Sequence, residues 1–449
     1  MDQSDIGLYV DDRPGEQIFR VDPAVYSDPE LFELEMKYIF ERTWIFLTLE
    51  SEIAKTNDFI TTRIARTPVI VTRKADGGIG AFINACRHKG ATVARVERGN
   101  ARYHVCPYHG WAYDSSGKNV DIKDRKSGCY APAFDADNHD LLPIARVQSY
   151  KGMVFGSLSA DVPPLEEFFG DARYFIDMWM DQGPQGMEII PGRCTYVYRG
   201  NWKFQMENGQ DAYHFSSTHA SFAEVQRRRI EGAGNTQART YDWKKRANQE
   251  SGIYDFPHGH STVWINLAEV EKRPIFPVLA EIESRVGREK AQWMLKQRNV
   301  VCFPNLQMAD QITPFLRLIR PISVDRTELC NLLLAPIGEA PELRAWRIRQ
   351  FEDFINPGGL ATPDDVAVFG DMQVGCSIPS LPWLQGYERG MSVLQPGADE
   401  TARNLGIAPG HSLKGLLEMQ NEAGLHAPFR EWVRLMKAGV EGRKAFSTK

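Results

Sequence analysis

Two short segments of the chain each place one cysteine close to one histidine. The first reads Cys86-x-His88, and the second, after seventeen intervening residues, reads Cys106-x2-His109. Thiolates and imidazoles bind both zinc and iron–sulfur clusters. Zinc fingers usually pair like with like, in C-x2–4-C and H-x3–5-H spacings, whereas each segment here supplies one ligand of each kind. The spacing leaves zinc as an alternative and favours a site that needs two thiolates and two imidazoles on separate metal ions.

A [2Fe–2S] cluster of the Rieske type divides its ligands in this way. Two thiolates bind one iron and two neutral imidazoles bind the other, which raises the reduction potential above that of an all-cysteine cluster. Gly90 and Gly110 come soon after the two histidines, and glycine permits the tight backbone turns that such loops require. We therefore expect a Rieske cluster on these four ligands.

A second group of polar side chains lies in the segment Asn201–His219, which reads NWKFQMENGQDAYHFSSTH. Its two histidines, His214 and His219, are five residues apart, which separates them by about 140° on an ideal helix. They converge on one metal ion only if the helix is broken between them, and the Ser-Ser-Thr run at this point favours such a break. Taken alone, the pair is better explained by two hydrogen-bonded polar side chains.

The cluster changes the interpretation of this segment, because a long chain that carries a single-electron carrier is expected to hold an electron acceptor as well. Two histidines and one carboxylate form the facial triad of non-heme Fe(II) oxygenases, which leaves coordination positions open for O2. The best downstream carboxylates lie in Thr362-Pro363-Asp364-Asp365. These acids are equally typical of a helix that starts with Thr362 as N-cap and a proline, so both roles stay open.

Two other classes of protein account for less of the sequence. A pure electron carrier needs only the cluster domain, and about 290 further residues with a second group of metal ligands would have no role. A zinc-stabilised interaction protein would be colourless and indifferent to O2.

The elements around the cluster ligands are predicted to be β-strands. Short β-type runs separated by turn signals extend from about Asp58 to Ser157, which predicts a small all-β domain. Beyond the linker-like Asp161–Pro164, further strand-like runs alternate with expected helices near 344–354, 363–373 and 426–438. An antiparallel sheet with helices packed on it is an α+β layout.

An N-terminal helix is expected to begin at Asp28-Pro29, with Asp28 as N-cap and the proline in the first turn. We therefore expect three segments. They are an N-terminal helical segment over 1–45 that packs on the catalytic domain, a Rieske [2Fe–2S] domain over 46–160, and a catalytic mononuclear-iron domain over 161–449.

Composition narrows the class of protein. The chain of 449 residues is 43% hydrophobic and 25% charged, with a net charge of −5 and scattered basic residues, so nucleic-acid binding is not expected. No stretch approaches the roughly 20 apolar residues of a membrane helix, and the acidic N-terminus lacks the apolar region of a signal peptide. Seven cysteines in so long a chain are typical of metal binding rather than of a disulfide scaffold. We expect a cytoplasmic protein without membrane contact.

The sequence resembles a known family over nearly its whole length, from Val21 to about Gln373. CRHKG and CPYHGW resemble the Rieske loops of ring-hydroxylating dioxygenase α subunits, and RGNWKFQMENGQDAYHFSSTH resembles their mononuclear-iron segment. The ENG and D-x-YH motifs, together with IRPISVDRTE and GLATPDD, are most similar to the benzoate and anthranilate dioxygenase branch, whose substrates are aromatic carboxylates.

The resemblance implies a role for individual residues. The cluster ligands would be Cys86, His88, Cys106 and His109. The ligands of the mononuclear Fe(II) would be His214, His219 and Asp365, the second aspartate of its pair. Asp211 would link the two metal centres across neighbouring subunits, and a carboxylate three residues before His214 can also reach the outer nitrogen of that imidazole. Asn208 is expected beside the iron or in the pocket.

The resemblance also implies partners and a reaction. Electrons from NADH would arrive through a separate flavin reductase or ferredoxin, and O2 and an aromatic ring would be converted to a cis-diol, catechol or phenol. The subunits would form a homotrimer, in this branch usually α3β3 with a small β subunit. After His219 the chain reads ASFAEVQRRR, where these relatives carry aromatic residues. Benzoate, anthranilate, salicylate and substituted benzoates therefore stay open, with a neutral aromatic hydrocarbon or aromatic amine as the alternative.

Overall fold

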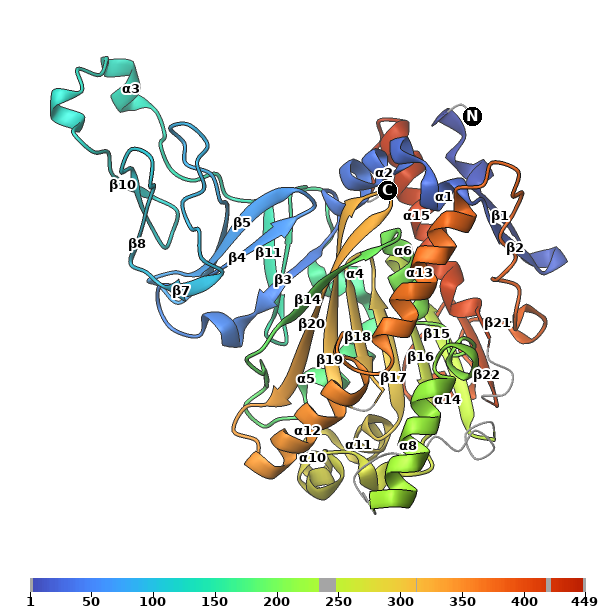
Figure 1. The fold of residues 1–449 in the computed structure, drawn as a ribbon. Helices are drawn as coiled ribbons and strands as arrows, with labels where there is room; N and C mark the ends of the chain where they lie inside the picture. The colour runs from blue at the N-terminus through green and yellow to red at the C-terminus, as the bar shows by residue number, and fades with distance from the viewer. Residues whose placement is uncertain (1–2, 234–247, 312, 417–420, 447–449) are drawn as a thin grey trace. The chain divides into compact units, whose positions relative to one another are not determined.

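The computed structural model describes residues 3–233, 248–311, 313–416 and 421–446. It divides into two units, one formed by Phe40–Leu165 and the other by Met1–Ile39 together with Glu166–Lys449 (Figure 1). No helix in the described part of the chain is long and apolar enough to cross a bilayer.

The smaller unit is built from three antiparallel sheets, which confirms the predicted all-β domain. Their strand orders are β6-β5-β4-β7, β10-β9-β8 and β11-β12-β3. The strands are β3 (Ile45–Leu49), β4 (Asp58–Ile64), β5 (Thr67–Arg73), β6 (Ile79–Ile83), β7 (Arg98–Asn100), β8 (Tyr103–Val105), β9 (Ala112–Asp114), β10 (Asn119–Asp121), β11 (Arg146–Tyr150) and β12 (Met153–Ser157).

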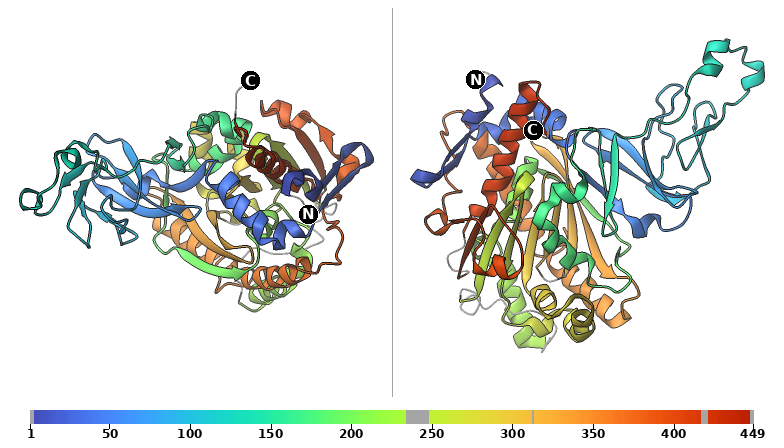
Figure 2. Two further views of the ribbon diagram at one scale, coloured as in Figure 1. Left: turned by 90° about the horizontal axis from the view of Figure 1, so that it is seen from above. Right: turned by 180° about the vertical axis from the view of Figure 1, so that it is seen from behind.

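The larger unit is built on one antiparallel sheet of ten strands, which confirms the α+β prediction (Figures 1 and 2). The order is β13-β20-β19-β18-β17-β16-β15-β22-β21, and β14 also pairs with β20. These strands are β13 (Met187–Ile189), β14 (Cys194–Arg199), β15 (Glu250–Phe256), β16 (His260–Ile265), β17 (Gln297–Cys302), β18 (Leu306–Asp310), β19 (Pro314–Ser323), β20 (Arg326–Pro336), β21 (Gln395–Pro396) and β22 (His411–Leu416). A separate hairpin pairs β1 (Val10–Arg13) with β2 (Ile18–Val21).

Helices pack against this sheet, with α12 against β20, α13 against β14 and α15 against β16. The three C-terminal helices expected from the sequence are α12, α13 and α15. The α-helices of the described residues are α1 (Ala24–Ser27), α2 (Pro29–Glu35), α3 (Pro132–Ala136), α4 (Leu165–Phe169), α5 (Arg173–Met180), α6 (Trp202–Asn208), α7 (Phe215–Thr218), α8 (Ala220–Ala233), α10 (Leu279–Val286), α11 (Arg288–Met294), α12 (Pro341–Phe354), α13 (Thr362–Cys376), α14 (Glu400–Asn404) and α15 (His426–Val440).

Two helix starts were predicted from capping patterns, and one of the two predictions is wrong. Asp28 caps α2 as expected, since its carboxylate accepts hydrogen bonds from the backbone N–H groups of Glu30 and Leu31 over 2.7 and 3.2 Å. Thr362, by contrast, is the first residue inside α13 and does not cap it. Its buried hydroxyl donates instead to the carbonyl of Ile355 over 2.6 Å, because a buried carbonyl needs a donor.

Helix α6, which leads into the second group of polar residues, is fixed at its start by buried hydrogen bonds. The side chain of Asn201 accepts from the backbone N–H of Lys203 over 3.1 Å and donates to the carbonyl of Tyr26 over 3.1 Å. The ammonium of Lys203 lies 2.5 Å from the carboxylate of Glu35, and both side chains are buried. The N-terminal segment thereby holds α6 in place, since breaking one partner of a buried pair costs about 3–5 kcal/mol.

Candidate metal centres

The two Cys-His segments of the smaller unit form loops with the same backbone geometry. In each loop the cysteine carbonyl accepts a hydrogen bond from the glycine four residues later, over 2.8 Å from Gly90 to Cys86 and 3.0 Å from Gly110 to Cys106. Both glycines have positive φ, +74° and +73°, a conformation that costs other residues a steric penalty. The glycines noted in the sequence therefore close two equivalent turns.

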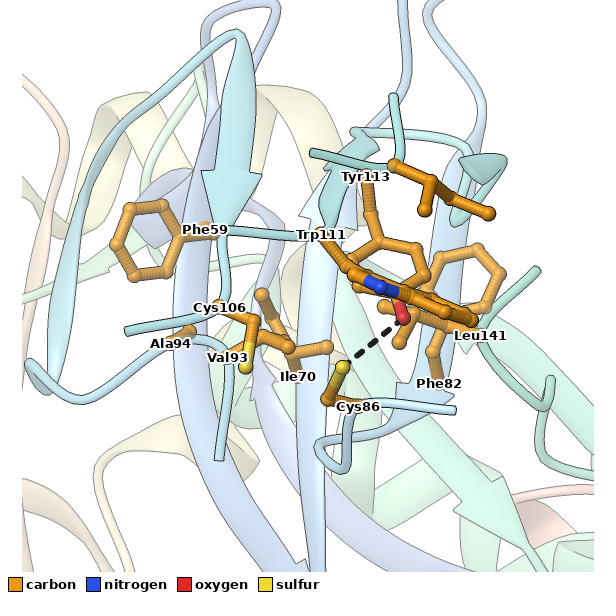
Figure 3. Close-up of a cluster of buried hydrophobic side chains, with 11 residues drawn as sticks. Phe59, Ile70, Phe82, Cys86, Val93, Ala94, Cys106, Trp111, Tyr113 and Leu141 are labelled. Atoms are coloured by element: carbon orange, nitrogen blue, oxygen red, sulfur yellow. Dashed lines mark hydrogen bonds between the residues drawn. The ribbon is translucent and has the colours of Figure 1, made fainter. Parts of the chain in front are cut away.

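The loops bring the four predicted ligands together, with the thiols inside and the imidazoles outside. The side chains of Cys86 and Cys106 belong to a buried core (Figure 3). The rings of His88 and His109 are half-buried and their centroids lie 4.4 Å apart. The His88 ring stacks on Trp111 at 5.0 Å and 8°. The extra residue between cysteine and histidine in the second loop does not prevent the imidazoles from meeting.

Tyr113 is a neighbour of these ligands that the sequence analysis missed. Its hydroxyl lies 3.2 Å from Cys86 Sγ (Figure 3). It also accepts a hydrogen bond from the backbone N–H of Arg87 over 3.1 Å. Because that N–H already donates to the oxygen, the phenol proton is available to the sulfur. Burial and the hydrogen bond to Cys86 raise the pKa of Tyr113, which keeps that proton in place. Hydrogen bonds to sulfur are among the factors that set cluster potentials.

The donor set fits a cluster with mixed ligands. Burial raises the pKa of the Cys86 thiol, so two thiolates in this core need a positively charged metal to stabilise them. His88 Nδ1 is buried and has no hydrogen-bond partner within the described residues. Burial and the neighbouring His109 lower the pKa of His88, which favours the neutral imidazole that binds metal.

In the larger unit, three predicted ligands come together. One ligand atom from each of His214, His219 and Asp365 lies within 4.8 Å of the others. Asp365 Oδ1 is 3.1 Å from His219 Nε2 and 3.6 Å from His214 Nε2. The two imidazoles meet at 76° with centroids 5.2 Å apart. Two imidazole nitrogens and one carboxylate oxygen on one side of a small space match the facial triad of non-heme Fe(II).

A break between the two histidines was predicted at the Ser-Ser-Thr run, and this position is wrong, because residues 216–218 are helical and the irregular backbone lies at His219. Helix α7 is a single turn, Phe215–Thr218, and α8 begins at Ala220. His219, between them, departs from helical geometry with φ −105° and ψ 26°. With the backbone irregular at His219, the Nε2 atoms of both imidazoles face Asp365.

Asp211 holds the outer edge of one imidazole. Its Oδ2 accepts a hydrogen bond from His214 Nδ1 over 3.1 Å, and its Oδ1 accepts one from the backbone N–H of Tyr213 over 2.6 Å. With the proton on Nδ1, the lone pair of His214 Nε2 points toward Asp365. Burial opposes a charge on His214, but the hydrogen bond and charge of Asp211 outweigh it, and the pKa of His214 lies above its usual value.

Asn208 lies on the inner side of the same group. Its amide nitrogen donates to Asp365 Oδ1 over 3.1 Å and is 3.2 Å from His214 Nε2. Burial would raise the pKa of Asp365, but the hydrogen bond and charge of His219 lower it below its usual value. An amide donor and an imidazole partner thus keep this buried carboxylate charged.

The neighbouring Asp364 has a different position. Its Oδ2 is 3.6 Å from His219 Nδ1, on the far side of that ring, and its side chain is 34% exposed against 9% for Asp365. Ser221 donates to it over 3.4 Å. Of these two aspartates, Asp365 is the one that faces the Nε2 atoms of both histidines.

Two cavities meet at these residues and share Asn208, Asp211, His214 and Asp365. The inner one holds about 40 Å³ of free space between the histidines and the sheet. This free space is smaller than the roughly 150 Å³ of an apolar cavity that binds benzene. The outer one, about 310 Å³, lies on the Asp211 side. The inner lining includes Arg317, which the sequence analysis did not single out.

Each of the two groups of ligands lies in a region of the chain that matches a known protein family. Residues 43–150 match the family "Rieske [2Fe-2S] domain", and residues 191–438 match "Ring hydroxylating alpha subunit (catalytic domain)". The chain is 43% identical to toluate 1,2-dioxygenase subunit alpha from Pseudomonas putida, over 90% of this chain and 88% of that protein. It is 39% identical to the 2-halobenzoate 1,2-dioxygenase large subunit from Burkholderia cepacia, over 94% and 90%.

A solved structure gives the same result for the fold. Naphthalene 1,2-dioxygenase from Rhodococcus sp. bound to indole aligns with a TM-score of 0.78 and 26% identity, over 93% of this chain and 94% of that one. The predicted fold, enzyme class and cofactors, a Rieske [2Fe–2S] cluster and a mononuclear iron, are confirmed. With two family matches and relatives aligned over most of its length, this chain belongs to the α subunits of the Rieske-type ring-hydroxylating oxygenases.

Proposed function

We propose that this chain is the large subunit of a terminal oxygenase that hydroxylates the ring of an aromatic carboxylate with O2 and electrons from NADH. The observation that carries the proposal is the His214, His219 and Asp365 group, which lies in the wall of a cavity in a chain that also carries a Rieske domain. The substrate class rests on the toluate and 2-halobenzoate dioxygenases, whose names are those of aromatic carboxylates. The product is a cis-diol, or a catechol or phenol if a substituent is lost or one oxygen enters.

We assign the metal ligands as follows. Cys86 and Cys106 bind one iron of the cluster, and His88 and His109 bind the other. The mononuclear Fe(II) is bound by His214, His219 and Asp365. When bound, this iron would supply open coordination positions for O2. Asn208 stabilises the charged form of Asp365 through its hydrogen bond.

Asp211 is proposed to have two partners. The first is His214, whose tautomer and ring orientation it fixes through the 3.1 Å hydrogen bond. The second is the equivalent of His109 in a neighbouring copy of the chain, which would reach Asp211 from the outer cavity. This role requires an oligomer, and we propose a homotrimer of α subunits, as α3β3 with a small β subunit. A flavin reductase or ferredoxin delivers the electrons.

We propose that 1–45 is an N-terminal segment of the catalytic domain, 46–160 the Rieske domain and 161–449 the catalytic domain. The unit boundaries at Ile39/Phe40 and Leu165/Glu166 support this division. A cytoplasmic location is proposed because the reaction depends on NADH.

The cluster assignment predicts a colour and a potential. The purified protein is expected to be red-brown, with a cluster midpoint potential between about −150 and +300 mV rather than near about −400 mV, because two imidazoles replace two thiolates. Cys86→Ser should abolish the colour, whereas Cys194→Ser, at a half-buried cysteine of the larger unit, should keep it. Protein that binds zinc and stays colourless after anaerobic reconstitution with iron and sulfide would contradict the assignment.

The substrate class is tested by turnover with a generic reductase. Benzoate, anthranilate, salicylate and halobenzoates are compared with biphenyl and naphthalene, and product is measured per NADH and per O2 consumed. We expect tight coupling with at least one acid, because a substrate that fits the pocket directs the reduced oxygen into product. Tight coupling with the neutral hydrocarbons and no product from any acid would refute the carboxylate assignment and leave the enzyme class intact.

A further inference from the structure

The inner cavity at the metal ligands contains one cationic side chain among its described lining residues, that of Arg317. Arg317 lies in the middle of β19, where its cross-strand neighbours are Gln307 on β18 and Asn331 on β20. Its side chain is only 3% exposed. The strands around it fix its position, and it contributes to the same cavity wall as His214 and Asp365.

Arg317 differs from the other buried arginines in the described part of the chain. Arg273 and Arg298 both pair with the carboxylate of Asp310, and Arg347 pairs with Glu339. No described carboxylate forms a salt bridge with Arg317. Its Nη1 donates to the amide oxygen of Gln307 over 3.2 Å, and its Nε is buried without a partner. A buried charge that lacks a counter-ion is unfavourable, so this arginine is incomplete as it stands.

The carboxylate of Asp365 lines the same cavity, but it is one of the three candidate metal ligands. The positive charge of Arg317 helps to lower the pKa of Asp365, after the larger effects of His219 and His214. Once a divalent metal is bound by two neutral imidazoles and one carboxylate, its net charge is about +1, and Arg317 adds another positive charge to the same cavity. An anion entering the cavity would offset this excess.

We propose that Arg317 binds the carboxylate of the aromatic substrate and so determines both specificity for acids and the position of the ring. This inference rests on the proposed function, and it assigns recognition of the substrate carboxylate to one residue. With Nη1 held by Gln307, the edge formed by Nε and Nη2 faces no described partner, and this edge matches the two oxygens of a carboxylate. The apolar lining residues Val263, Ile265 and Phe354 are left for the ring.

The test compares binding of benzoate and of benzamide, its neutral analogue, to the oxidised holoenzyme by calorimetry. In Arg317→Gln the Kd for benzoate is expected to rise roughly 10- to 100-fold, the cost of losing hydrogen bonds to a charged group. The Kd for benzamide should change less than about threefold. Arg317→Lys keeps the charge without the fork, and it should weaken benzoate binding less than the glutamine variant does.

Arg320→Gln is the matched control. Arg320 lies three residues along the same strand, on its opposite face, and pairs with Glu328 over 3.0 Å. Loss of this charge should leave both dissociation constants and the iron content unchanged. Iron content is measured in every variant, because an arginine that only supports Asp365 would lose iron on substitution.

The outcomes separate this inference from the proposed function. Equal weakening of benzoate and benzamide, or loss of iron in both Arg317 variants, would assign Arg317 a structural role and overturn the inference. Unchanged benzoate binding in iron-replete Arg317→Gln would also overturn the inference, while the carboxylate substrate class survives. If the parent enzyme binds no aromatic acid and hydroxylates neutral rings, the proposed function has failed and the inference falls with it.

Discussion

Replacing Asp211 with alanine is expected to abolish turnover while both metal centres stay in place. Asp211 accepts a hydrogen bond from Nδ1, the outer nitrogen of His214. It is not one of the three residues whose ligand atoms face the mononuclear site. Loss of such an outer partner alone costs roughly 10- to 100-fold in metal affinity or activity. If Asp211 also connects this imidazole to the cluster of a neighbouring subunit, its removal should lower activity by far more than this factor. The size of the loss therefore distinguishes orientation of His214 from connection of the two centres.

The measurement follows the reduced cluster directly. Protein reduced once by dithionite is mixed with O2 and substrate, and re-oxidation of the cluster is recorded by absorbance. The parent protein should re-oxidise its cluster and form product, whereas Asp211→Ala should keep the cluster reduced. Asp211→Asn retains an oxygen that can accept from His214, so an equally strong defect in this variant would point to the carboxylate as the connecting group.

Glu422→Gln is the control for Asp211→Ala. Glu422 also lines the outer cavity, and burial, with a further contribution from Asp211, raises its pKa to about 8. It is therefore mostly neutral at pH 7, and glutamine is a close substitute, so turnover should stay near the parent value. Activity of metal-replete Asp211→Ala within about 100-fold of the parent would show that Asp211 only orients His214.

The parts of the sites that were predictable from the sequence are the local ones. The cluster loops combine four ligands and two glycines within twenty-five residues, and each backbone turn closes on itself between the cysteine and the glycine four residues later. In these loops short-range chemistry decides the geometry. An irregular backbone near His219 was predicted from three poor helix formers in a row, but its position was not, because those residues form α7 and the irregular residue is His219 itself.

The parts that were missed depend on strand pairing over long distances in the sequence. Tyr113 reaches Cys86 from a different hairpin, and Arg317 has its environment set by its neighbours on β18 and β20. No spacing within a single segment indicates these contacts. The wrong N-cap at Thr362 has the same origin, because the carbonyl of Ile355 that takes its hydroxyl proton becomes available only when the loop before α13 folds.

Asp365→Ala is expected to lose the mononuclear iron and keep the cluster. The ratio of iron to acid-labile sulfide should fall from about three to two toward one to one, since the cluster holds two of each. The reason is the position of Oδ1, 3.1 and 3.6 Å from the Nε2 atoms of the two histidines. Without the carboxylate, two neutral imidazoles remain, and the Fe(II) ion loses its only anionic ligand from the described residues.

Asp364→Ala provides the comparison, because it removes the same side chain one residue earlier in the first turn of α13. Its carboxylate lies 3.6 Å from His219 Nδ1, the nitrogen that faces away from the other ligands. This variant should keep most of its iron and lose about 0.5–1 kcal/mol of stability at the helix N-terminus, measured by thermal unfolding. If Asp364→Ala loses iron and Asp365→Ala keeps it, Asp364 is the ligand and the α13 side chains bind the metal in a register shifted by one residue. If both variants keep iron, the third ligand lies elsewhere, and the carboxylate at Asp365 serves only to balance the charges of His219 and Arg317.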